Sequence, residues 1–165
     1  MIKIVKIPEE RLPVLIGTKG STKRVIARAT KTKITVDEEV VIEGESLDVM
    51  TAENIVRAIG RGFSPIKAKA LLDENNTLEM RDLPKDERTT RRIRSRLIGT
   101  NGKCRRNIER LTNTRISVYG KTVAIIGPYN GVAFAMDAVN RIIKGIPHRS
   151  VYEFLEGKQD ERDED

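Results

Sequence analysis

The sequence is poor in the residue types on which several common protein classes depend. Its 165 residues include one cysteine, one histidine, no tryptophan and only 4% aromatic residues. The single cysteine, Cys104, excludes an internal disulfide framework and favours a reducing compartment. One histidine and one cysteine are too few for a structural zinc site. So few aromatic residues also argue against a β-sheet platform that stacks nucleic-acid bases on aromatic rings.

Long apolar runs and catalytic motifs are also missing. No run approaches the roughly 20 apolar residues that span a bilayer, and the N-terminal residues alternate like a strand instead of forming a secretory signal. Neither glycine-rich turn has the spacing of a phosphate-binding Walker motif. Acidic pairs such as Glu38 and Glu39 have no histidine or cysteine nearby in the sequence, so a metal site or an acid–base pair is not expected there. We therefore expect a cytoplasmic, non-enzymatic protein without metal, cofactor or membrane partner.

An internal repeat dominates what the sequence does contain. The hexamer LIGTKG at positions 15–20 recurs 82 residues later as LIGTNG at positions 97–102. A cationic amphipathic stretch follows each hexamer, and then a strand-like segment, at 32–36 in the first copy and 114–118 in the second. Because internal repetition overrides the single-domain expectation from length, we predict two modules of one kind.

Positive charge gathers around the two hexamers. The net charge is +7, and positions 11–33 hold seven cations and no anion, whereas positions 85–110 hold ten cations and three anions. The acids lie elsewhere, in a block at 37–53 and in the tail at 160–165. Cations confined to the same part of both copies indicate a binding surface for a polyanion.

Apolar periodicity predicts the same element order in both copies, β-α-α-β-β-α with a trailing helix. Three strands with helices on one face form an α+β fold of two layers. Ser21 is placed to cap the second helix, and Thr22, Ile26 and Ala29 share one of its faces, as Cys104, Ile108 and Leu111 do in the second copy. Cys104 is thus expected in the core, and His148 at a helix cap or on the surface.

The predicted domains are 1–74, 75–157 and an acidic disordered tail, 158–165. The predicted elements are strands at 2–7, 33–36, 40–43 and 77–80, and helices at 9–16, 21–30, 47–59, 86–98 and 132–143.

A Gly-x-x-Gly turn between two helices suits the binding of a phosphate backbone. Glycine lets the backbone approach a phosphate without an intervening side chain, and the next helix directs its free amides and positive dipole end to the same anion. An isoleucine beside the turn and another on the adjacent strand, Ile34 or Ile116, offer an apolar floor for unstacked bases. The candidate RNA-binding residues are Ile98, Gly99, Thr100, Asn101, Gly102, Lys103, Arg105, Arg106, Arg110 and Ile116 in the second copy, and Ile16, Gly17, Thr18, Lys19, Gly20, Arg24 and Arg28 in the first.

With these motifs, positions 2–155 resemble tandem KH domains of the eukaryotic type (type I), in which the glycine loop clamps about four nucleotides of single strand. The pairing of two modules, with PHRSVY at 147–152, resembles the archaeal form of the Partner of Nob One family of small-subunit ribosome assembly factors. That resemblance implies binding of the 3′ end region of small-subunit (pre-)rRNA. It further implies contact with a maturation nuclease and with the alpha subunit of initiation factor two. In eukaryotic members the first glycine loop is degenerate, whereas here it is intact.

Two hypotheses follow, and they can both hold. The first is a single-stranded RNA-binding assembly factor, and the alternative is an adaptor that bridges translation or ribosome assembly proteins. The two copies differ in the turn between the strands of the hairpin. Its sequence is Asp37-Glu38-Glu39 in the first copy and Tyr119-Gly120-Lys121 in the second. The resemblance to KH domains implies that this turn forms one wall of the nucleotide groove, where three acids would repel phosphate. We therefore predict that the second copy binds RNA and the first a protein.

Overall fold

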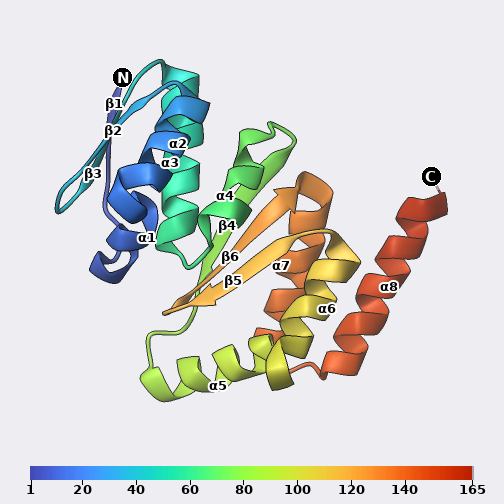
Figure 1. The fold of residues 1–165 in the computed structure, drawn as a ribbon. Helices are drawn as coiled ribbons and strands as arrows, with labels where there is room; N and C mark the ends of the chain where they lie inside the picture. The colour runs from blue at the N-terminus through green and yellow to red at the C-terminus, as the bar shows by residue number, and fades with distance from the viewer. Residues whose placement is uncertain (165) are drawn as a thin grey trace. The chain divides into compact units, whose positions relative to one another are not determined.

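The chain folds into two units that repeat one architecture. The computed structural model describes residues 1–164, without the side chains of residues 162 and 164 (Figure 1). Unit 1 comprises Met1–Asn76, and unit 2 begins at Thr77. This division falls two residues after the boundary expected from the repeat.

Unit 1 has the predicted order of elements. A short 3-10 turn, Glu9–Arg11, precedes the first helix, and a second, Thr18–Gly20, contains the glycine loop. Its elements are β1 (Ile2–Val5), η1 (Glu9–Arg11), α1 (Leu12–Ile16), η2 (Thr18–Gly20), α2 (Ser21–Thr30), β2 (Lys33–Val36), β3 (Val40–Glu43), α3 (Ser46–Gly60), α4 (Pro65–Ala68) and η3 (Lys69–Leu72).

Unit 2 repeats this order with longer strands, a longer first helix and a longer trailing helix. Its first helix has 12 residues, against five in α1, and its trailing helix has 17. The elements are β4 (Asn76–Asp82), α5 (Glu87–Ile98), η4 (Thr100–Gly102), α6 (Lys103–Thr112), β5 (Arg115–Tyr119), β6 (Thr122–Pro128), α7 (Tyr129–Ile143) and α8 (His148–Glu164).

Each unit builds one three-stranded sheet whose central strand is the last in sequence. The strand orders are β1-β3-β2 and β4-β6-β5, so β2 and β5 are edge strands. The hairpins are antiparallel, with Ile34 opposite Ile42 in unit 1 and Ile116 opposite Ile125 in unit 2. All four isoleucines are buried, because alternate residues of each strand face the helices. The α+β fold with two repeated β-α-α-β-β-α units is confirmed.

Buried helix faces follow the predicted periodicity in unit 2 but not fully in unit 1. Cys104, Ile108 and Leu111 are each at most 2% exposed, which confirms Cys104 as a core residue. Burial raises the pKa of the Cys104 thiol, so the group stays protonated. In α2, however, Ile26 and Thr30 are buried while Ala29 is exposed. The prediction for Ala29 is therefore wrong. The buried face continues from Ile26 to Thr30, four residues later, and the Thr30 hydroxyl donates to the Ile26 carbonyl at 2.8 Å.

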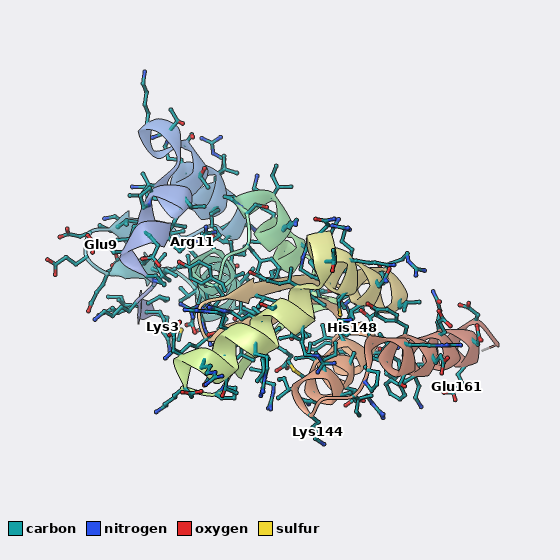
Figure 2. All side chains as sticks on the ribbon, turned by 90° about the horizontal axis from the view of Figure 1, so that it is seen from below. Lys3, Glu9, Arg11, Lys144, His148 and Glu161 are labelled. Carbon is teal, nitrogen blue, oxygen red and sulfur yellow. The ribbon has the colours of Figure 1, made fainter. Side chains whose placement is uncertain are left out.

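The trailing segment differs between the units and from the prediction. In unit 1 it consists of the short α4 and η3, whereas in unit 2 α8 runs from His148 to Glu164, past Glu161 near its far end (Figure 2). Disorder expected from residue 158 onward is therefore wrong for residues 158–164, and residue 165 lies outside the described residues. Good helix formers and a Lys158–Glu161 ion pair at 3.5 Å favour helix there. The Lys158 ammonium also lies 5.8 Å from the Phe154 ring.

Two features are absent from residues 1–164, and both bear on the class of protein. None of the helices described there has the length and apolar character needed to cross a bilayer. Within the same described residues, no three histidine, cysteine, aspartate or glutamate side chains come together as metal ligands would.

Close packing at Gly60 generates a stability prediction. A Cβ added to this buried residue at the end of α3 would lie 2.6 Å from Cγ2 and 2.8 Å from Cβ of Ile7. We expect Gly60→Ala to lower the free energy of unfolding by about 1–3 kcal/mol through overpacking, despite the better helix propensity of alanine.

Gly157→Ala is the matched control, because a Cβ on this residue of α8 meets no atom within 4 Å. We expect it to stabilise by up to about 1 kcal/mol in urea denaturation. Equal effects of the two changes would contradict the packing argument.

Candidate nucleic-acid interface

The two glycine loops have the same backbone conformation. Their φ and ψ angles are 71° and 179° at Gly17 against 74° and 176° at Gly99, and 76° and 13° at both Gly20 and Gly102. Between them, Lys19 and Asn101 are both left-handed, with a φ of 54°. The repeat read from the sequence is therefore also a repeat of backbone geometry.

The first glycine of each loop is required by contact as well as by its positive φ. A Cβ at Gly99 would lie 2.8 Å from both the amide nitrogen and the Cβ of Cys104, and a Cβ at Gly17 would collide with the hydroxyl of Thr22. The loop is thus pressed against the start of the following helix. Any larger residue would push it away and change where its peptide groups point.

The helices after the loops begin without a side-chain cap. Gly20 and Gly102 are the N-caps of α2 and α6, neither offers a side-chain acceptor, and neither helix has an acid in its first turn. Ser21, predicted as a cap, is instead the first residue of α2 and accepts no capping hydrogen bond. By contrast, Asp86 caps α5 by accepting from the Thr89 amide at 2.9 Å. The Ser21 and Lys103 amides donate to the carbonyls of Thr18 and Thr100, so the first-turn amides that follow them are the ones placed to donate to an external anion.

An arginine one turn into each helix holds the loop. The Nη1 atom of Arg24 donates to the Lys19 carbonyl at 2.7 Å, and that of Arg106 donates to the Asn101 carbonyl at 2.5 Å. Both carbonyls belong to the left-handed residue of their loop. The guanidinium groups neutralise an oxygen that would repel phosphate, and they also bring positive charge to the turn. Arg28 and Arg110, one turn further, are exposed.

The apolar floor is smaller than predicted from the sequence. Ile98 is 36% exposed beside the loop and Ile16 is half-buried, whereas Ile116 is only 5% exposed within the core of unit 2. Exposed Thr100 and Lys103 flank Asn101 and Gly102. In each unit the predicted residues from the isoleucine to the arginine that holds the loop thus lie at one turn, whereas Arg28 and Arg110 lie one turn further along their helices. The apolar surface at the turn comes mainly from the isoleucine before the first glycine.

Sequence reasoning missed a link between α6 and the edge strand β5. Glu109 pairs with Arg105 at 3.0 Å through Oε1, and its Oε2 accepts from the Ile116 amide at 2.9 Å. Arg105 is therefore partly buried and engaged within the protein. Unit 1 has Lys23 and Ala27 at the matching positions, so it cannot form this link. An isolated acid four residues after an arginine, in an otherwise cationic helix, was the available signal.

Several cations counted toward the polyanion surface have structural roles instead. Arg96 donates to the carbonyls of Ile142 at 2.6 Å and Ile146 at 2.8 Å, both near the end of α7. Arg11 makes the equivalent contacts in unit 1, to Ile59 at 2.8 Å and Phe63 at 2.9 Å. These two arginines do not align in the repeat, because α5 is longer than α1. The Arg94 side chain donates to the Gly120 carbonyl at 2.9 Å and so fixes the hairpin turn.

Comparisons with known proteins agree with this geometry. The family model described as "Eukaryotic type KH-domain (KH-domain type I)" matches residues 74–160, and the model described as "KH domain" matches residues 2–58. Together the two matches include both glycine loops.

Similar proteins come from archaea and eukaryotes. "KH domain-containing protein MJ0443" of Methanocaldococcus jannaschii is 42% identical over 94% of this chain and 73% of its own length. "Pre-rRNA-processing protein pno1" of Aspergillus oryzae is 33% identical over 61% of this chain and 41% of its length. The KH protein in a solved a/eIF2alpha–aDim2p–rRNA complex from Pyrococcus horikoshii OT3 is 42% identical, with a TM-score of 0.91 over 98% of this chain and 95% of that one.

The arginine contact generates a prediction about loop order. Replacing Arg106 by alanine removes the donor to Asn101, so the turn closed by the Gly102 amide on the Gly99 carbonyl should open more often. We expect hydrogen exchange of the Gly102 amide to become roughly 2- to 10-fold faster, the equivalent of a hydrogen bond worth about 0.5–1.5 kcal/mol. Arg110→Ala, on the same helix, is the control and should leave this rate unchanged. The same acceleration in both variants would argue for a general effect of charge.

Proposed function

Because this chain belongs to the KH-domain family, among its Pno1-like members, we propose that it is an RNA-binding ribosome assembly factor. It holds single-stranded RNA at the glycine loop of unit 2, and its target is the 3′ end region of small-subunit (pre-)rRNA. The observation that carries this proposal is the uncapped start of α6, set behind a loop with no side chain at its two glycines.

The chemistry of this loop suits a phosphodiester backbone. The first-turn amides of α6 that follow Lys103 donate to phosphate oxygens, and Arg106 and Lys103 supply positive charge within one turn of them. The half-exposed Ile98 beside the loop offers an apolar contact to an unstacked base. An apolar contact of this kind favours single strands, whose bases are free, over duplex RNA.

The choice of RNA rests on the relatives. The Aspergillus relative is named for pre-rRNA processing, and the Pyrococcus complex contains rRNA together with a KH protein of the same fold. The 3′ end region and a maturation nuclease as partner come from the family resemblance. The proposal gives this chain no catalytic step, and it places the protein in the cytoplasm with its RNA.

A second role, as an adaptor, is favoured for unit 1. Eight of the ten large apolar side chains exposed among the described residues belong to this unit, including Leu47 at 78% and Ile66 at 82%. Its acidic turn, Asp37 to Glu39, is exposed and would repel phosphate. The similar Pyrococcus protein was solved in a complex that contains a/eIF2alpha. We therefore propose that unit 1 binds a protein, and the alpha subunit of initiation factor two is the candidate.

The backbone-clamp mechanism predicts strong salt dependence. For single strands the logarithm of the binding constant falls with the logarithm of salt concentration at about −0.7 per neutralised phosphate. About four phosphates held by one loop give a slope of about −3, and engagement of both loops would nearly double it. Fluorescence anisotropy of a labelled single-stranded RNA at several potassium chloride concentrations measures the slope. A slope near zero would rule out this mechanism.

The asymmetry between the units predicts unequal effects of loop mutations. We expect Asn101→Asp with Gly102→Asp to reduce RNA affinity by roughly tenfold or more, and by more than Lys19→Asp with Gly20→Asp. The unit 1 pair makes the larger change in charge, so this ranking cannot be produced by net charge. Circular dichroism checks that both variants fold. Equal losses would mean that both loops share one RNA through avidity, and a larger loss from the unit 1 pair would show the ranking to be wrong.

A further inference from the structure

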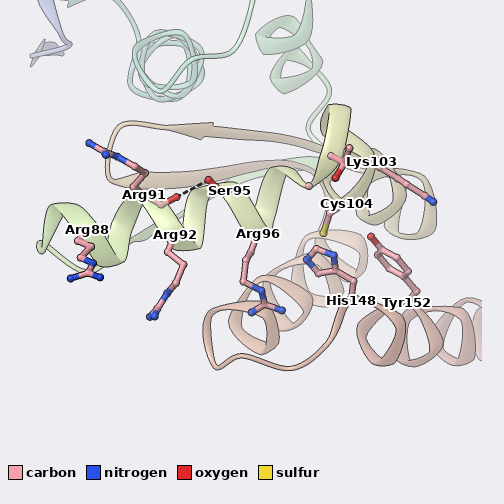
Figure 3. Close-up of a pocket in the computed structure, with 11 residues that line it drawn as sticks. Arg88, Arg91, Arg92, Ser95, Arg96, Lys103, Cys104, His148 and Tyr152 are labelled. Carbon is pink, nitrogen blue, oxygen red and sulfur yellow. Dashed lines mark hydrogen bonds between the residues drawn. The ribbon is translucent and has the colours of Figure 1, made fainter.

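A basic cavity lies within unit 2, behind the glycine loop. Its volume is about 610 Å³, in the range of pockets that hold a small ligand. It is open to solvent and is lined by one face of α5, the first residues of the loop and the starts of α6 and α8 (Figure 3). The side chains that give it chemical character are Arg88, Arg92, Arg96, Lys103, His148 and Tyr152.

The cations of this cavity are not all used within the protein. Arg88, Arg92 and Arg96 extend from the same side of α5, whereas Arg91 points away from them (Figure 3). Arg96 is bound to two carbonyls, but Arg88 and Arg92 are exposed and enter none of the hydrogen bonds or ion pairs found among the described residues. No carboxylate lines the cavity in the described part of the chain. Its potential is therefore positive, and it suits an anionic ligand.

Two rings at the start of α8 form the opposite wall. The rings of His148 and Tyr152 are 6.1 Å apart and tilted by 32°, and the shielded Nε2 atom of His148 has no hydrogen-bond partner. The Tyr152 hydroxyl points toward the Cys104 thiol (Figure 3), and burial raises the pKa of Tyr152, so its phenol stays neutral. An aromatic wall facing arginines can take a flat ring and a phosphate together.

We propose that this cavity is a second nucleotide subsite of unit 2. It takes the nucleotide that adjoins those held by the glycine loop, with its phosphate against Arg88 and Arg92 and its base against Tyr152. The inference rests on the RNA binding proposed above. Gly99 and Thr100 line the cavity and also belong to the loop, so a strand that leaves the loop meets the cavity directly. An acidic peptide would use the cations but not the aromatic wall.

Unit 1 cannot form an equivalent subsite. Its first helix, α1, has five residues and lacks the extra turns that carry Arg88 and Arg92 in α5. The preceding 3-10 turn carries Glu9 and Glu10 instead, and the trailing α4 has four residues. The subsite therefore gives unit 2 a longer footprint on RNA than unit 1 has.

The test measures how affinity depends on RNA length. Single-stranded RNAs of 4, 6, 8 and 10 nucleotides, trimmed in turn from each end of one parent 10-mer, are titrated by fluorescence anisotropy into the full chain and its variants. For the wild type, we expect affinity to rise when nucleotides are added beyond four on one side.

Arg88→Ala with Arg92→Ala should lower the affinity for the longer RNAs only, by about tenfold. The salt slope of this variant should be less negative by about 0.7 for each phosphate that these arginines neutralise. Tyr152→Leu should lose about 5- to 100-fold on the same RNAs, and less when the added nucleotide is abasic.

Matched controls separate the subsite from general charge. Lys6→Ala with Arg57→Ala removes two exposed cations of unit 1 and should change no affinity. The arginine variant remains decisive if Tyr152→Leu does not fold, because Arg88 and Arg92 are exposed. Unchanged affinity, or an equal loss on the tetramer, would overturn the subsite. So would binding of an oligoglutamate peptide that depends on these arginines while RNA affinity does not. If the wild type binds none of the RNAs, the proposed function itself fails.

Discussion

The candidate site depends on one constraint, the contact between the first glycine of each loop and the helix that follows it. At Gly99 there is no room for a Cβ against Cys104, and at Gly17 there is none against Thr22. This contact forces the chain to turn within four residues and start a new helix with its amides facing outward. The open helix start, the position of Arg106 and the exposed edge of Ile98 all follow from that turn. Without it, the surrounding cations would be an ordinary charged surface.

Arginine has two separate roles in this molecule, and charge counts cannot distinguish them. Arg11 and Arg96 bind carbonyls near the ends of α3 and α7, where a cation also complements the helix dipole. Arg106 holds the loop, while Arg88 and Arg92, at the cavity, enter no hydrogen bond or ion pair in the described part of the chain. The planar fork of the guanidinium group suits the structural role, because it binds two carbonyls at once. The net positive charge of a segment therefore overstates the charge available to a ligand.

The two units share a loop but differ in what surrounds it. Unit 2 has the Glu109 link to β5, a longer first helix and a 17-residue trailing helix, and the two helices line the basic cavity. Unit 1 has an acidic turn and most of the exposed large apolar side chains. Duplication thus supplied the same glycine turn twice, and the flanking elements differ between the copies, as the proposed division of partners requires.

The sequence alone determined the repeated fold, the loop residues and the burial of Cys104, because local periodicity and glycine spacing encode them directly. It misjudged Ala29 and residues 158–164, since the end of a helix face and the persistence of a charged helix depend on particular side-chain contacts. Only the tertiary structure revealed which arginines are engaged, that Glu109 reaches Ile116, and that α5 and α8 line one cavity. Those features join residues that lie far apart along the chain or on different elements, and no local pattern records which side chains meet across such distances.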